Sequence, residues 1–365
     1  MRRLLLSLAL LGLLTGCGAA PEAVSPVYTD WSQLEPYAPT EPVYTEFSSY
    51  SGETLQPRDD YGPLLPYVGA YPDTRSYMGH CPLLGLVTAD GAVVTDPVYA
   101  QIQMAGSFWG SAPEYGRFLL LYRGELTGYE TTEWGTSPVG GFSLTVAALD
   151  GSWVRELGQN YGSPQILEGN RLALTGQDGS ALILNSDGTD GTYFPASTLE
   201  PFLGEGFQWS WEGGPDLSWD GRYGWIWRYD ENDPNGDGIV CWLDADTGTV
   251  TAERPADYVP TEYAYEEAPV FPGYDGYVTT LADPITGAVY HYARREAGSG
   301  ADLLDADGNV VLAGREMPYL TLGIGDGFSP WVWADRIAYG EDGFFCYCDR
   351  EGNLIFRYPV ETNSD

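Results

Sequence analysis

The chain has 365 residues and a formal net charge of −35, with 52 acidic residues against 17 basic ones and no lysine. A surface with this much negative charge repels phosphate backbones. Nucleic acid is therefore not expected as a partner. The lack of lysine excludes P-loop and Schiff-base chemistry. Hydrophobic residues make up 43% of the chain, enough for a sizeable core, and the abundance of Tyr, Trp and Gly with frequent Asp-Gly pairs favours an all-β fold.

Residues 1–17 have the features of an export signal. Arg2 and Arg3 precede an apolar stretch over residues 4–14, which is shorter than the roughly 20 apolar residues needed to span a bilayer. A charged start, a short apolar core and small residues before a cleavage point are typical of a secretory signal peptide. Residues 14–17, with the sequence LTGC, resemble the bacterial lipobox. This resemblance implies that Cys17 becomes the first mature residue and carries acyl chains.

We therefore expect a lipoprotein anchored through Cys17 in the cell membrane, on its extracytoplasmic face. The alternative is a plain secretion signal with an incidental cysteine. Residues 18–60 are rich in Pro, Ser, Thr, Tyr and Glu, which predicts a spacer between the membrane and the body. A short duplication within it, PVYTDWS and then PVYTEFS, is either a docking motif or an early strand. The main domain is predicted over 61–360, followed by a tail over 361–365.

One pattern recurs along the main domain. A short apolar run leads into a turn that contains Asp and Gly, and a second apolar run follows. The pattern occurs over residues 85–94, 144–154, 171–184, 240–250, 278–290, 302–312 and 345–358. Asp and Gly supply the positive φ that tight hairpin turns need. Hairpins at this loose spacing are typical of propeller blades. We predict an irregular β-propeller-like body of six or seven blades, with a pair of β-sandwiches as the alternative.

Two segments resemble known repeat families. Residues 85–99, with a Gly-hydrophobic start, a DG turn and a terminal P-x-Y, resemble one unit of the bacterial WG-repeat family, although Leu84 stands where that family has Trp. Residues 217–223 and then 243–248 resemble a blade of bacterial WD-like surface propellers, with an SxDG-R-Y turn and a later LDxxTG turn. Both resemblances imply repeated β-sheet units and a binding or scaffolding role, and neither assigns catalytic residues.

Residues 233–244 carry the spacing of a calcium-binding loop. Oxygen-bearing side chains stand at the first, third, fifth and twelfth places, a glycine at the sixth and a backbone carbonyl at the seventh, supplied by Asp233, Asn235, Asp237, Asp244, Gly238 and Ile239. The loop resembles that of dockerins and EF-hands. It differs in ending on Asp rather than Glu and in having flanks that read as strands. Calcium is the predicted ligand, and an acidic hairpin turn without metal is the alternative.

Tryptophans crowd the same region. If their segments are strands, Trp209 and Trp211 share one face, and so do Trp225 and Trp227. Exposed indole rings in such a row could stack on sugars, which makes these four residues candidate ligand-binding positions. Buried rings would instead pack the blade, and burial is the favoured interpretation.

Signals for catalysis are weak. His80 and His291 are the only histidines, which excludes a His-rich metal site, and no G-x-S-x-G motif is present. We therefore expect a non-enzymatic binding or scaffolding module for a protein or a glycan. The alternative is an extracellular glycoside-active enzyme on the same scaffold, which would need a carboxylate pair that the sequence does not single out.

Cysteine usage does not indicate a disulfide framework in so large a domain. Cys346 and Cys348 lie two residues apart in a predicted strand, so they would share one face. They are predicted to be buried free thiols. A Cys81–Cys241 bridge stays open.

Overall fold

The computed structural model describes residues 52–68, 83–106, 115–132, 135–203, 217–228, 238–260, 269–283, 286–296, 300–314, 332–341 and 344–359. Within these ranges there is one α-helix, α2 (Ala196–Leu203), and otherwise strands and turns. None of the helical structure in the described ranges is long and apolar enough to cross a membrane. The signal segment, most of the predicted spacer and the predicted tail lie outside the described residues. So do six of the predicted site residues: Cys17, Trp209, Trp211, Asp233, Asn235 and Asp237.

The described strands form six antiparallel sheets, named A to F in chain order. Sheet A holds β1 (Leu64–Val68) and β2 (Leu84–Thr88). Sheet B holds β3 (Gln101–Gly106), β4 (Tyr115–Thr132), β5 (Gly135–Ala148) and β6 (Val154–Gly158). Sheet C holds β7 (Tyr161–Leu167), β8 (Arg171–Gly176), β9 (Ala181–Leu184) and β10 (Asp190–Phe194).

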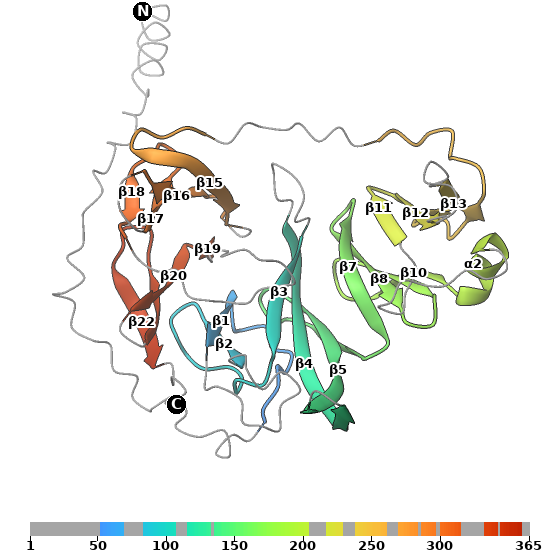
Figure 1. The fold of residues 1–365 in the computed structure, drawn as a ribbon, viewed down its shortest axis with the longest axis horizontal. Coiled ribbons are helices and arrows are strands. Elements are labelled where there is room, and N and C mark those ends of the chain that lie inside the picture. The colour runs from blue at the N-terminus through green and yellow to red at the C-terminus, as the bar shows by residue number, and fades with distance from the viewer. Residues whose placement is uncertain are drawn as a thin grey trace, which may run out of the picture.

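Sheet D holds β11 (Leu217–Asp220), β12 (Tyr223–Arg228), β13 (Gly238–Asp244) and β14 (Val250–Thr251). Sheet E holds β15 (Tyr274–Ala282), β16 (Val289–Arg295), β17 (Ala301–Asp305) and β18 (Val310–Leu312). Sheet F holds β19 (Val332–Trp333), β20 (Arg336–Glu341), β21 (Phe344–Cys348) and β22 (Leu354–Pro359). Sheets B to F each contain four strands in sequence order, and the described sheets lie along an open arc in the order D, C, B, A, F, E (Figure 1). The predicted all-β, propeller-like body is confirmed.

The Asp- and Gly-containing turns reverse the chain where the sequence predicts. All seven predicted segments pair antiparallel with themselves, six as strand hairpins and residues 85–94 through the bridge Val87–Val93. The aspartate carboxylates stabilise these turns by accepting backbone N–H groups, as Asp178 does from Ser180 at 3.0 Å. The side-chain hydrogen bond from Ser180 also lowers the pKa of Asp178. Many of the chain's acids are therefore structural parts of turns.

Apolar clusters lock neighbouring sheets together. One joins sheet A to both sheet B and sheet F, and others join B to C, C to D, and E to F. Among the described residues no such cluster joins sheet D to sheet E, and Figure 1 shows these two sheets standing apart. The ends of the described chain meet where sheet A packs on sheet F: Tyr347 donates its hydroxyl to the carbonyl of Pro66 at 2.7 Å.

Sheet A shows why the segment resembling a WG repeat begins with glycine. The fully buried ring of Tyr67 lies across Gly85, so that a Cβ there would stand 2.3 Å from a ring carbon. The Tyr67 hydroxyl in turn donates to the carbonyl of Thr95 at 2.9 Å, which fixes the ring. Residues 52–60, at the end of the predicted spacer, pack on this part of the body, with Leu55 buried in the same cluster.

The described cysteines behave as predicted for buried thiols. Cys346 and Cys348 are buried thiols outside disulfides on one face of β21, within the cluster that joins sheets E and F. Cys241 is also free and buried, and burial raises the pKa of its thiol to about 11. Cys81 lies outside the described residues. The three described thiols are core residues rather than reactive groups.

Candidate functional site

Sheet D carries most of the described residues that the sequence singles out, and its two faces differ. Opposite residues in paired antiparallel strands share a face. One face, with Trp219, Ile226 and Leu243, is buried against sheet C. The other face carries Tyr223 and Trp225 on β12 and their partners on β13. That face turns away from sheet C and is the candidate ligand surface.

An aromatic cluster forms on this outer face. Trp225 lies directly opposite Trp242, with ring centroids 5.5 Å apart. Tyr258, from the connection after β14, closes over both, 4.9 Å from Trp242 and 6.0 Å from Trp225. Tyr223 meets Tyr258 edge-on at 5.8 Å, and the guanidinium of Arg254 lies over the Tyr258 ring at 4.9 Å. These four rings, Tyr223, Trp225, Trp242 and Tyr258, are the sheet D aromatic cluster.

The cluster divides the predicted tryptophans by role. Trp225 is half-buried within it. Trp227 lies two residues further along β12 and is 42% exposed. Its strand partner Ile239 is also exposed, at 36%. The ring of Trp227 is therefore accessible to a ligand, in contrast to the half-buried ring of Trp225.

Sequence reasoning missed Trp242 and Tyr258. Trp242 could have been found by pairing β12 with β13, because the hairpin register sets it opposite Trp225. Tyr258 has no such signal: its hydroxyl donates to Asp220 at 2.8 Å across a separation of 38 residues. Only the folded connection brings Tyr258 to the sheet.

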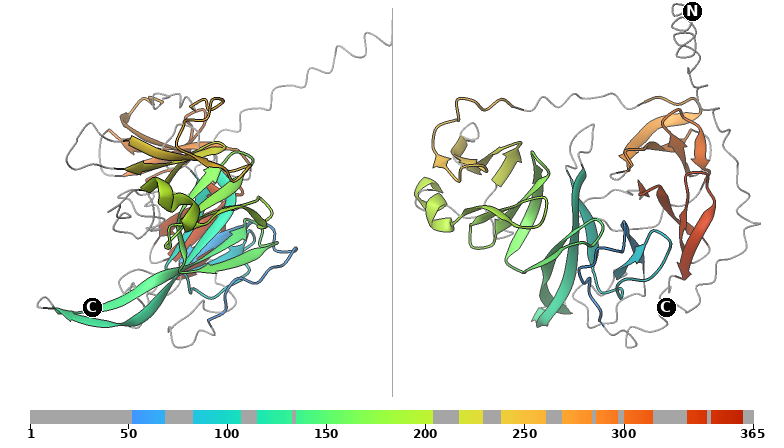
Figure 2. Two further views of the ribbon diagram at one scale, coloured as in Figure 1. Left: turned by 90° about the vertical axis from the view of Figure 1, so that its right-hand side faces the viewer. Right: turned by 180° about the vertical axis from the view of Figure 1, so that it is seen from behind.

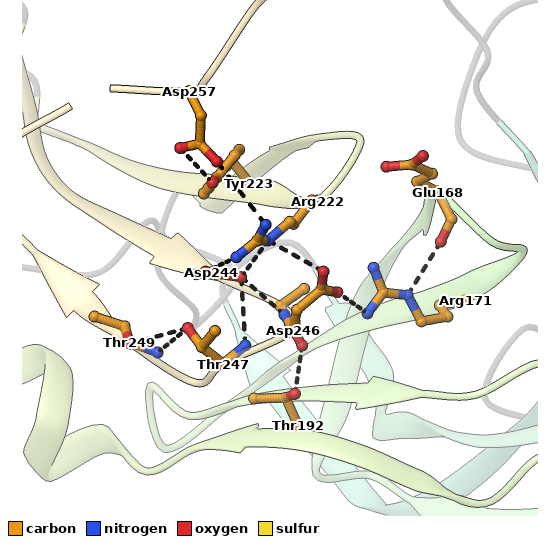
Figure 3. A network of polar contacts seen from close by, with 11 residues as sticks. Glu168, Arg171, Thr192, Arg222, Tyr223, Asp244, Asp246, Thr247, Thr249 and Asp257 are labelled. Atoms are coloured by element: carbon orange, nitrogen blue, oxygen red, sulfur yellow. Dashed lines mark hydrogen bonds and ion pairs between the residues drawn. The ribbon is translucent and has the colours of Figure 1, made fainter. Parts of the chain in front are cut away.

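A charged network joins the turns of sheet D to sheet C (Figure 3). Arg222 donates from Nε to Oδ1 of Asp244 at 2.8 Å and from Nη2 to Oδ2 of the same carboxylate. Its Nε also lies 3.1 Å from Asp246, whose other oxygen accepts from Arg171 of β8 at 2.8 Å. These four residues, Arg171, Arg222, Asp244 and Asp246, form an interblade clasp. The segments that resemble a WD-like blade supply three of the four.

Two members of the clasp, Asp244 and Arg222, have shifted pKa values. Burial alone would raise the pKa of Asp244, but the hydrogen bonds from Arg222 and from the N–H groups of Asp246 and Thr247 outweigh it and lower this pKa to about 2. The hydrogen bond to Asp244 raises the pKa of Arg222 still further above neutrality. The Tyr223 hydroxyl donates to Asp257 at 2.7 Å, and that bond raises the Tyr223 pKa. Asp244, Arg222 and Tyr223 therefore hold the fold together and offer no proton near pH 7.

Only residues 238–244 of the predicted calcium loop are among the described residues. Ile239 lies near the start of β13 and Asp244 at its end. The Asp244 carboxylate accepts hydrogen bonds from Arg222 and from two turn N–H groups. Within the described ranges no group of three or more His, Cys, Asp or Glu residues is placed to hold a metal ion. The loop side chains at 233, 235 and 237 lie outside those ranges, so calcium binding stays a prediction.

Comparisons with known proteins give the following. No protein-family model and no curated protein sequence matches this chain. Among solved structures, the chain is similar to the β-propeller domain of the Trilobed protease from Pyrococcus furiosus, described as having an open velcro topology. The two share 12% identity over 83% of each chain, with a TM-score of 0.28. The propeller-like architecture rests on the six sheets and their order.

Proposed function

We propose that this protein is a lipoprotein anchored at Cys17 on the extracytoplasmic face of the cell membrane, and that its β-propeller-like body is a non-enzymatic binding or scaffolding module. The lipobox-like residues 14–17 support the anchor. The ordered sheets, joined by turn aspartates and the interblade clasp, support a rigid body that presents a surface.

The observation that favours binding over chemistry is the state of the acids. In the described part of the chain, each carboxyl group with a shifted pKa has it lowered, as at Asp60, Asp90, Asp178, Asp187, Asp244 and Asp302. Glycoside hydrolysis needs a carboxylic acid whose pKa is raised enough to donate a proton. These six carboxylates are tied to N–H groups, hydroxyls or arginines instead.

The ligand is a protein or a glycan, and the outer face of sheet D is the proposed contact. Trp227 offers an exposed ring beside the aromatic cluster, and ring faces pack on the apolar faces of sugars or on apolar side chains. A neutral glycan also avoids the repulsion that a net charge of −35 exerts on anions.

A glycan array with the full mature chain tests this contact. Binding should fall at least tenfold in Trp227→Ala and stay unchanged in Tyr193→Ala, a matched loss of a 50% exposed ring on sheet C. No glycan binding, together with capture of a protein that Trp227→Ala abolishes, would assign a protein ligand. Loss of binding in neither variant would remove sheet D from the proposal.

The anchor has its own test. Metabolic labelling with an alkyne fatty acid should mark the wild type and Cys81→Ala and leave Cys17→Ala unlabelled. Label that survives in Cys17→Ala would show that residues 1–17 do not direct lipidation.

Calcium is the proposed ion of the 233–244 loop. Calorimetry should give a binding heat that disappears in the double variant Asp233→Ala plus Asp237→Ala and remains in the turn variant Asp187→Asn. No heat in the wild type would assign the loop to an acidic turn without metal.

A further inference from the structure

The β4–β5 hairpin is longer than the sheet to which it belongs. β3 pairs with β4 only from Tyr115 to Tyr122, and β6 pairs with β5 only from Leu144 to Ala147. Beyond those points β4 and β5 continue to pair with each other, through Thr132 and Gly135. At about 3.4 Å per residue this extension is about 30 Å long. Figure 2 (left) shows it reaching away from the other sheets.

Residues 123–132 of β4 and 135–143 of β5 make up what we call the distal ribbon. No described strand lies along either of its edges. In a two-stranded ribbon about half of the backbone N–H and C=O groups point outward along the two edges. Such a ribbon is marginally stable at best in water, and a third strand stabilises it.

The distal ribbon is built to leave its backbone accessible. Gly124, Gly128 and Gly140 lie within it and have no side chain to cover the edge, whereas Gly141 lies beside the Gln159 side chain. A Cβ added at Gly128 would meet nothing within 4 Å. Glycine at this density weakens a free strand and often marks a close approach by another backbone.

The negative charge of the chain indicates which kind of partner the distal ribbon could bind. The charged residues of the distal ribbon are Arg123 at its base and Glu125 and Glu130 further out, on a chain whose net charge is −35. A second copy of so acidic a chain would be repelled, whereas a basic polypeptide would be attracted. We propose that the distal ribbon is a docking edge that takes an extended segment of a basic protein as an added antiparallel strand.

The inference is independent of the ligand contact on sheet D. The distal ribbon belongs to sheet B, and its recognition uses backbone groups rather than aromatic rings. Trp227→Ala should therefore leave docking on the ribbon unchanged, so that failure of one proposal does not decide the other.

Hydrogen exchange on the full mature chain tests docking without any variant. The probe is a ten-residue peptide of alternating Thr and Lys, and its control is the same peptide with alternate amides N-methylated, which keeps the charge and removes donors along one edge. Exchange of amides 123–130 should slow at least tenfold with the probe and less than twofold with the control. Equal binding of the two peptides, or unchanged exchange with both, would overturn the proposal.

A substitution at Thr127 adds a second test. The β4–β5 register passes from Leu126–Gly140 to Gly128–Val139, so Thr127 has no Cα partner in β5. Proline is tolerated at such bulges and removes one donor. Thr127→Pro should lose the probe-induced protection, whereas Thr127→Val should keep it. Protection that rises with protein concentration alone would overturn the basic partner in favour of a second copy of this chain.

Discussion

Replacing Asp244 by asparagine tests whether the interblade clasp stabilises the body. Asparagine keeps an oxygen for the turn N–H groups of Asp246 and Thr247 but removes the charge that pairs with Arg222. We expect Asp244→Asn to lower the free energy of unfolding at pH 7 and to make it less dependent on pH between 7 and 3.

The size of the effect follows from the Asp244 pKa. A drop from 3.8 to about 2 on folding corresponds to about 2.5 kcal/mol at pH 7. The Arg222 side chain is 32% exposed, so solvent weakens the pair, and we expect a measured loss of about 1–2 kcal/mol. Because the folded pKa is depressed, this stabilisation is present above pH 3.8 and is lost as the pH falls toward 2. At pH 3 about half of it should remain.

Urea unfolding of the mature chain, followed by tryptophan fluorescence at pH 7, 5 and 3, gives the measurement. Asp187→Asn is the matched control, because Asp187 accepts from the N–H and hydroxyl of Thr189 on an exposed turn. It should lose much less stability. Equal losses in the two variants, or an Asp244→Asn loss that is the same at pH 7 and pH 3, would refute the clasp as a charged interaction.

Three further outcomes follow from the core. Gly85→Ala should destabilise the body by about 1–3 kcal/mol in thermal unfolding, because the added Cβ meets the buried Tyr67 ring, and an unchanged melting temperature would contradict that packing. Cys346 and Cys348 should resist iodoacetamide until the protein unfolds, whereas rapid labelling of the native chain would show them to be accessible. Burial lowers the pKa of His291, so stability should fall as the pH drops below 6.5, and His291→Gln should flatten that part of the pH profile.

Local chemistry explains why the hairpins could be predicted. In residues 302–312, for example, the Asp305 carboxylate accepts the N–H groups of Asp307 and Asn309, and Gly308 has φ of +84°. All these contacts lie within five residues, so the amino-acid types alone favour the turn. The same holds for the Cys346–Cys348 pair, whose shared face follows from strand alternation.

The candidate site could be predicted only in part, because its contacts join residues that lie far apart along the chain. The sequence points to Trp225 and Trp227, but their roles depend on neighbours distant along the chain. Tyr258 reaches the aromatic cluster from beyond β14, and Arg171 reaches the clasp from sheet C, 75 residues from Asp246. Asp244 fits a calcium pattern by spacing, and the fold shows its partnership with Arg222.

The all-β class, the hairpin turns, the acidic surface and the buried thiols could be predicted, because each depends on composition or on residues close along the chain. Three features could not be predicted: sheet A packs on sheet F, no described apolar cluster joins sheets D and E, and the β4–β5 hairpin extends past its sheet. These features depend on which apolar faces meet and where strand pairing stops. Contacts between distant segments set both, and no local pattern encodes them.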